Sequence, residues 1–279
     1  MDNKNTLEKN DLNLPIFSYS KISSYKACPK QFKYCYIDKL PRLDKTFTLL
    51  GSYTHDTLER FHKFYLIEGN ENVPFVDTMQ KVFIEAKHHW ESKEINENQL
   101  RITKDQLKEA YQMMVEYLLL LNKGNNPKVI SVEKKIWLDI DNKFILLGYI
   151  DRIQIDQDGE IHIADYKTTK DPKYLTDRTQ LMLYAYSLYC EDPSLEKVRT
   201  SYILLKHKMK SLVKEHSIKE IIETKDKLVE VFTQIQDDKL FRPSPSSFKC
   251  KFCDYSKYCA DGSRLLCGGN KSVLGKSDW

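Results

Sequence analysis

The chain has 279 residues, 41% of them hydrophobic and 30% charged, a globular balance that excludes a disordered or fibrous protein. Its 44 basic and 40 acidic residues give a formal charge of +4, which permits a nucleic-acid partner without arguing for one. The N-terminus has no apolar signal segment, and the longest aliphatic run, Leu118 to Leu121, is far shorter than the ~20 residues of a membrane span. We therefore expect a cytoplasmic protein with reduced cysteines.

The first half of the chain predicts a polar arm followed by helices. Residues 1–14 are polar and predict a flexible arm. Ser20 is the expected cap of a short helix that ends near Cys28, because Pro29 disfavours helix at the residue before it. Apolar residues at helical spacing predict three further helices, over 48–67, 75–92 and 104–121.

The second half predicts a sheet. Apolar alternation predicts three strands, over 129–139, 143–155 and 160–167. The later expected elements are a helix at 174–190, strands at 198–206 and 211–216, a helix at 218–237 and an irregular tail from 260 onward. This order predicts an α/β (α+β) fold, a mixed sheet flanked by helices with a helical N-terminal elaboration. We expect one domain over 15–260, with a helical insertion at about 48–122, a catalytic core at about 129–240 and a tail at 261–279.

A carboxylate-bearing hairpin is the chemical centre of the sequence. Asp158-Gly159 is a strong hairpin signal. A three-residue loop over 157–159, with Gly159 left-handed, pairs Asp151 directly with Asp165 and leaves Lys167 on the same face. A two-residue loop would put the two aspartates on opposite faces, and we prefer the three-residue loop.

The paired aspartates predict a cation site. Two facing carboxylates repel each other, and a divalent cation removes that penalty. Mg²⁺ and Mn²⁺ prefer carboxylate oxygens and keep water positions for a phosphate substrate. The alternative is an ordinary charged hairpin edge, which the apolar residues Ile161, Ile163 and Ala164 before the Asp-x-Lys make the weaker interpretation.

The motifs resemble a known nuclease family. Asp151 with Asp165-Tyr166-Lys167 resembles the PD-(D/E)xK signature, and "GYIDRI" and "IADYKTT" are similar to the RecB/AddB-like branch, which includes the RecB-like nuclease of CRISPR adaptation. The helix histidine of that branch matches His55 in "GSYTHDTLERF", and its Gln-x-x-x-Tyr helix matches "QLMLYAY". The resemblance spans residues 18 to about 260 and implies a restriction-endonuclease-like fold.

The resemblance also implies roles for individual residues. It implies that His55, Asp151, Asp165 and the backbone carbonyl of Tyr166 bind metal, and that Lys167 positions or activates the attacking water. Gln180 and Tyr184, four residues apart on one helix face, would orient the lysine and the phosphate.

Two glutamates are open candidates. Glu59 is a further ligand or a helix-surface charge, and we favour the latter. Glu133 lines the cleft or is a solvated strand end.

The cysteines form a second candidate site. The chain has seven, an odd number that fits poorly with a disulfide framework. Cys250, Cys253 and Cys259 follow a C-x2-C-x5-C pattern, and Cys28 is the expected fourth ligand of a Zn²⁺ ion or an iron–sulfur cluster. The RecB-like resemblance favours a [4Fe–4S] cluster. Cys35, Cys190 and Cys267 are expected spares, with Cys190 a small buried apolar residue.

A basic and aromatic stretch suggests a substrate. Charged and aromatic side chains alternate through Lys26, Lys30, Phe32, Lys33, Tyr34, Tyr36, Lys39, Arg42 and Lys45. Such a pattern suits single-stranded nucleic acid, although a charged surface over core aromatics explains it nearly as well.

Three functions compete. The first is a Mg²⁺- or Mn²⁺-dependent deoxyribonuclease, an exonuclease on single-stranded DNA ends in recombination and repair or CRISPR adaptation. The second is a nuclease-fold DNA-binding subunit that acts as a scaffold in a larger complex. The third is a zinc-dependent nucleic-acid adaptor, for which the hairpin would be incidental.

Overall fold

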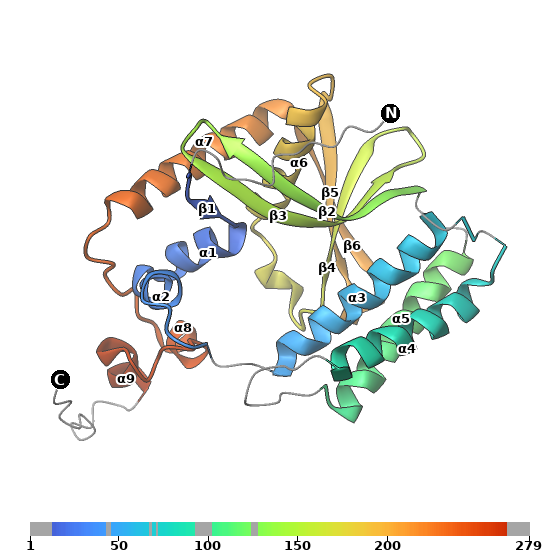
Figure 1. Cartoon of the computed structure of the whole chain (residues 1–279), viewed down its shortest axis with the longest axis horizontal. Helices are drawn as coiled ribbons and strands as arrows, with labels where there is room; N and C mark the ends of the chain where they lie inside the picture. Colours follow the sequence, from blue (N-terminus) through green and yellow to red (C-terminus); the bar gives the residue numbers. More distant parts are fainter. Residues whose placement is uncertain are drawn as a thin grey trace. The chain divides into compact units, whose positions relative to one another are not determined.

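The structure is a computed structural model that describes residues 13–42, 46–66, 69–70, 72–92, 102–123 and 128–266. Within the stretch expected to form one domain, Cα proximity separates two units (Figure 1). Unit 1 comprises Met1–Ile16 and Asp44–Val229, and unit 2 comprises Phe17–Leu43 and Glu230–Trp279. The expected arm at 1–14 lies almost entirely outside the described residues.

A mixed six-stranded sheet organises unit 1. Its strands are β1 (Ile16–Phe17), β2 (Lys128–Ile140), β3 (Phe144–Ile155), β4 (Ile161–Lys167), β5 (Lys197–Leu204) and β6 (Lys210–Ser217). The order is β1-β3-β4-β5-β6, and β2 also pairs with β3. β4 and β5 are parallel, whereas the β2–β3, β3–β4 and β5–β6 pairs are antiparallel. The predicted mixed sheet flanked by helices is thus confirmed.

The β3–β4 hairpin has the three-residue loop that the sequence predicts. Gly159 adopts a φ of +88°, and its N–H donates to the Asp156 carbonyl at 2.9 Å. The Asp156 N–H donates to the Glu160 carbonyl at 3.0 Å, which closes the loop. The ladder then runs from Ile155↔Ile161 to Arg152↔Ala164, the register that carries Asp151 opposite Asp165.

Three long helices cover one face of the sheet in unit 1. They are α3 (Thr46–Leu66), α4 (Phe75–Ser92) and α5 (Lys104–Asn122), which lie side by side in Figure 1. Thr103 begins α5 with a capping box to Gln106. The helices share a buried core with Ala164 and Tyr166 of β4, so even-numbered β4 side chains face the helices and Asp165 and Lys167 face away. Each large core side chain contributes roughly 1.5–3 kcal/mol to folding.

The remaining helix of the sheet region is α6 (Thr179–Glu191), which follows a 3₁₀ turn at Pro172–Tyr174. α7 (Ile218–Asp237) comes after β6. Among the helices that the structure describes, none combines the length and the apolar character that crossing a lipid bilayer requires.

Unit 2 joins an N-terminal and a C-terminal segment. Its elements are α1 (Tyr19–Ala27), α2 (Pro29–Phe32), a π-helical turn (Lys33–Ile37), α8 (Ser247–Lys251) and α9 (Ala260–Leu266). Aromatic rings form its core, with Phe32 stacked on Phe241 at 6.1 Å and edge-on to Tyr25 at 5.6 Å. The Tyr25 hydroxyl donates to Asp238 at 2.9 Å, so contacts more than 200 residues apart in sequence hold this unit together.

Several expectations about local structure are wrong. Ser18, not Ser20, caps α1, because its hydroxyl accepts the Lys21 N–H and Ser20 lies inside the helix. The helix expected from 174 begins at Thr179, and the strand expected to reach 206 ends at Leu204, where a 3₁₀ turn follows. The chain is not irregular from 260 onward, since α9 occupies the first residues of that stretch and residues 267–279 lie outside the described part.

Candidate active site

Three carboxylates form a row across three neighbouring strands. The pairs Val132↔Arg152 and Lys134↔Ile150 place Glu133 of β2 opposite Asp151 of β3. One step beyond Arg152↔Ala164, the hairpin register places Asp151 opposite Asp165 of β4. The sheet therefore concentrates negative charge along one line, which is unfavourable unless cations or protons balance it.

The β3–β4 ladder ends where this row begins, and side chains take over its hydrogen bonds. The Tyr166 N–H donates to Asp151 Oδ2 at 2.8 Å. The Tyr166 carbonyl accepts from Nε2 of His55 at 2.8 Å, and His55 Nδ1 lies 3.3 Å from Asp151 Oδ2. His55 of α3, Asp151 and the Tyr166 carbonyl, which the resemblance implies as metal ligands, thus contact one another.

The charge state of His55 follows from these contacts. Burial disfavours the imidazolium, but the Asp151 carboxylate outweighs burial and raises the pKa of His55 to about 9. Burial likewise disfavours the Asp151 carboxylate, yet His55 and the Tyr166 N–H together lower the pKa of Asp151. At neutral pH the two residues form an ion pair where a metal ion and its ligands would meet.

Glu133 belongs to the same site, which resolves the alternative left open by the sequence. One ligand atom each from His55, Glu133 and Asp151 lie within 4.8 Å of one another. Burial and the neighbouring charges of Asp151 and Glu59 raise the pKa of Glu133 to about 7. Its φ of +46° is in the left-handed region, a costly conformation for a non-glycine residue that often marks functional sites. Glu59 itself pairs with Lys63 and lies outside this group of three.

Asp165 and Lys167 form the second half of the site. Lys167 Nζ lies 2.7 Å from Asp165 Oδ2, and the Asp165 side chain is only 4% exposed. Burial and the negative charge of Asp151 raise the pKa of Asp165 to about 6, against the opposing effect of Lys167. Asp165 also lies outside the close group of His55, Glu133 and Asp151, because its carboxylate is turned to the lysine.

A short chain of side chains holds the lysine. Lys167 Nζ donates to Gln180 Oε1 at 3.4 Å, and Gln180 Nε2 donates to the Tyr184 hydroxyl at 2.9 Å. The ring of Tyr202, which pairs with Asp165 in the β4–β5 register, lies 5.2 Å from the ammonium. The sequence gave no signal for Tyr202, because that contact depends on the parallel pairing of β4 with β5.

Gly148 makes room for this arrangement. A Cβ at position 148 would lie 2.9 Å from Cε1 of Tyr184, closer than real Cβ contacts. Glycine on β3 therefore lets the Tyr184 ring approach the strand that carries Asp151.

A buried polar network lies on the helical side of Tyr166. Arg152 Nη1 donates to the hydroxyls of Tyr117 and Tyr166 at 3.1 and 2.8 Å. Burial and the charge of Arg152 hold the pKa of His62 well below its usual range, so His62 Nε2 accepts from the Tyr117 hydroxyl at 2.8 Å. The network ties α3 and α5 to β4, and thereby fixes the His55 helix against the Tyr166 carbonyl.

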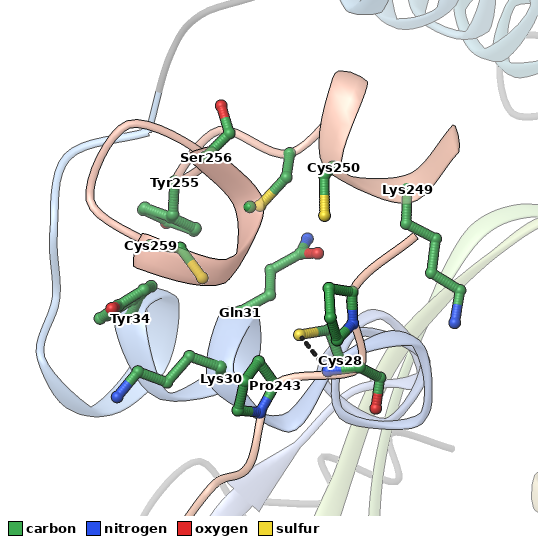
Figure 2. A pocket seen from close by; sticks show the side chains of 14 residues that line it. Cys28, Lys30, Gln31, Tyr34, Pro243, Lys249, Cys250, Tyr255, Ser256 and Cys259 are labelled. Carbon is green, nitrogen blue, oxygen red and sulfur yellow. Dashed lines mark hydrogen bonds between the residues drawn. The ribbon is translucent and has the colours of Figure 1, made fainter. Parts of the chain in front are cut away.

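The four predicted cluster cysteines line one pocket in unit 2. Cys28, Cys250, Cys253 and Cys259 all contribute to its wall, together with Lys30, Gln31, Tyr34 and Lys249. Figure 2 shows Cys28 on the N-terminal segment facing Cys250 and Cys259 on the C-terminal one. The Ser244 N–H donates to Cys28 Sγ at 3.4 Å, and burial raises the pKa of the Cys253 thiol.

The spacing of the thiols bears on the metal. No three of the described cysteine sulfurs lie within 4.8 Å of one another. Four thiolates around one Zn²⁺ at ~2.3 Å would be closer than that. The sulfurs are therefore spread more widely than a formed zinc site requires.

The other cysteines and the basic aromatic stretch need corrections. Cys190 is exposed at the end of α6, so the expectation of a buried residue is wrong. Cys35 accepts from Arg42 Nε at 2.9 Å, and Cys267 lies outside the described residues. Phe32 is 4% exposed and belongs to the unit 2 core, so this ring is not available for stacking on a nucleic acid.

Comparison with known proteins gives one family. The model of the PD-(D/E)XK nuclease superfamily matches residues 16–260, which is most of the chain and includes both candidate sites. The helix-flanked mixed sheet is consistent with the restriction-endonuclease-like fold that the resemblance implied.

Individual relatives are more distant. The Gene 69 protein of Mycobacterium phage D29 is 28% identical over 133 residues, which are 46% of this chain and 47% of that protein, so the chain spans about half of this relative's length. Two solved structures share 15% and 10% identity: SSO0001, with 88% of this chain and 85% of that one covered and a TM-score of 0.38, and a candidate exonuclease from Eubacterium rectale, with 100% and 96% covered and a TM-score of 0.49. Neither likeness supports an assignment of function.

Proposed function

Because the chain belongs to the PD-(D/E)XK nuclease superfamily, we propose that it is a Mg²⁺- or Mn²⁺-dependent deoxyribonuclease, an exonuclease that hydrolyses phosphodiester bonds at single-stranded DNA ends. The observation that carries the proposal is the convergence of Asp151, Asp165 and Lys167 beside His55. A charge row without a cation would only destabilise the sheet, whereas with a cation it becomes a phosphate site.

The donor set suits a hard divalent cation. His55, Glu133, Asp151, Asp165 and the Tyr166 carbonyl would hold it, with four oxygen donors and a single imidazole. When bound, such a cation lowers the pKa of a coordinated water and offsets charge on the phosphate.

The side chains of the protein supply the rest of the chemistry. Lys167 would orient the attacking water and offset charge that develops on the scissile phosphate. Gln180 and Tyr184 would keep the lysine ammonium directed at the site, through the contacts of 3.4 and 2.9 Å. Their role is positioning, because neither needs to touch the reacting atoms.

We further propose a [4Fe–4S] cluster on Cys28, Cys250, Cys253 and Cys259. Each thiolate would bind a different iron atom, so the four sulfurs stand farther apart than around a single zinc ion. The spread of the thiols supports this choice. The cluster would cross-link the two segments of unit 2, and a reducing cytoplasm would keep the thiols free to bind it.

The pathway follows only from the RecB/AddB-like resemblance. We propose a role in DNA processing for recombination and repair or for CRISPR adaptation, with partner proteins of such a complex. The match of half the length of the phage relative adds no substrate.

The test is cleavage of end-labelled single- and double-stranded DNA in EDTA, Mg²⁺ and Mn²⁺. We expect metal-dependent loss of single strands from an end by the wild type and none by Lys167→Ala. Equal cleavage by both proteins would refute the site. No cleavage by either would leave the scaffold function.

A separate test addresses the cluster. Anaerobically purified protein should be brown and contain four iron atoms per chain, in keeping with the proposed cluster composition. A colourless protein with one zinc per chain would refute the iron–sulfur assignment.

A further inference from the structure

The excess positive charge of the chain lies in unit 2. By sequence this unit has fourteen basic and seven acidic residues, a net charge of +7. Since the whole chain carries +4, unit 1 carries −3. A polyanion is therefore attracted to the cysteine-bearing unit more strongly than to the unit with the carboxylate row.

Unit 2 also exposes aromatic rings close to its cysteines. Phe248, Phe252 and Tyr258 are 62%, 54% and 58% exposed, although rings of this size are usually covered. Phe248 and Phe252 are four residues apart, on one face at the end of α8. Their ring centroids are 5.4 Å apart at an interplanar angle of 64°, so the two rings form one contiguous apolar surface.

Lysines border this surface. Lys251 Nζ lies 5.9 Å from the centroid of the Phe252 ring, and Lys257 is exposed in the next turn. Lys249 is already engaged, because its ammonium donates to the Ala27 carbonyl at 3.0 Å. Two ammonium groups near two exposed rings match the chemistry of phosphate groups alternating with base faces.

We propose that the Phe248–Phe252 surface of unit 2 binds single-stranded nucleic acid by stacking its rings on unpaired bases. The inference rests on the proposed nuclease function and adds a binding surface that is separate from the carboxylate row. Stacking selects single strands, because base faces in a duplex are already covered. Lys251 and Lys257 supply the contacts to phosphate, which are sensitive to salt.

The experiment is fluorescence anisotropy with the full chain in EDTA, so that metal-dependent cleavage cannot occur. The probes are a labelled oligothymidine of about 20 nucleotides, longer than the ~4–16 nucleotides that one single-strand-binding fold covers, and an abasic strand of the same length. We expect Phe248→Ala/Phe252→Ala to weaken oligothymidine binding by about 30-fold or more, and to leave binding of the abasic strand unchanged.

Two control variants separate stacking from folding. Tyr111→Ala removes a half-exposed ring of α5 in unit 1 and should bind oligothymidine like the wild type. Phe248→Trp/Phe252→Trp keeps two rings and should restore binding that the alanine variant loses.

Three results would overturn the inference: unchanged oligothymidine binding by the alanine variant, an equal loss on the abasic strand, or a wild-type dimer that the alanine variant converts to a monomer. The last would mean that the rings form a protein interface. The metal-dependent cleavage assay is read separately, so cleavage without an effect of the rings refutes only this inference, whereas binding through the rings without cleavage refutes only the nuclease.

Discussion

Replacing Asp165 by asparagine should stabilise the metal-free protein. Burial and Asp151 raise the pKa of Asp165 from 3.8 to about 6, so at neutral pH the folded state holds a carboxylate that would prefer a proton. A shift of about two units corresponds to ~3 kcal/mol, which the neutral asparagine would recover at pH 7. The cost of the carboxylate is a consequence of a site that a cation completes.

The sign with pH follows from the same shift. For an acid whose pKa is raised on folding, stability falls as pH rises from the unfolded pKa, ~4, to the folded value of about 6, and then levels off. The advantage of Asp165→Asn should therefore be near zero at about pH 4 and full above about pH 7.

Urea unfolding in EDTA measures this difference, followed by tryptophan fluorescence, since Trp90 and Trp137 both lie in unit 1. Added Mn²⁺ should then raise the unfolding midpoint of the wild type more than that of the variant. A variant less stable than the wild type at neutral pH, or a gain that does not change with pH, would refute the argument that the buried carboxylate is uncompensated.

Three further changes test other parts of the structure. Gly148→Ala should cost ~1–3 kcal/mol and reduce cleavage, because the new methyl group displaces Tyr184; thermal unfolding and a cleavage assay measure both, and an unchanged melting temperature would contradict the close approach. Tyr117→Phe should cost ~1–3 kcal/mol, because it leaves Arg152 short of a buried acceptor; equal urea midpoints for the variant and the wild type would argue against the network. Cys28→Ser should abolish the brown colour and bound iron while urea unfolding of unit 1 stays unchanged, and retention of full iron content would remove this residue from the ligand set.

Local rules predicted the centre of the site correctly. The Asp158-Gly159 turn fixes the hairpin register within a few residues, and that register alone carries Asp151 opposite Asp165. The helix that carries His55 is likewise visible as an apolar stripe, although its contact with the Tyr166 carbonyl depends on where the β3–β4 ladder ends.

Features that depend on pairing distant segments could not be read from the sequence. Glu133 joins the site only because β2 pairs with β3 in a register that leaves it opposite Asp151, with a left-handed backbone. Phe32 reads as a ring in a basic stretch, yet contacts with a segment 200 residues later bury it. Phe248, by contrast, remains exposed.

The most direct test of the central claim combines metal binding and cleavage in Lys167→Ala. Titration calorimetry with Mn²⁺ should give the variant an affinity within a few-fold of the wild type, because the ammonium is not a ligand. Cleavage of labelled single-stranded DNA at saturating Mn²⁺ should fall by ~10²-fold or more, the usual effect of losing a group that manages protons or charge in the transition state. A variant that binds Mn²⁺ and cleaves at the wild-type rate would contradict the assignment of the carboxylate row and its lysine as the active site.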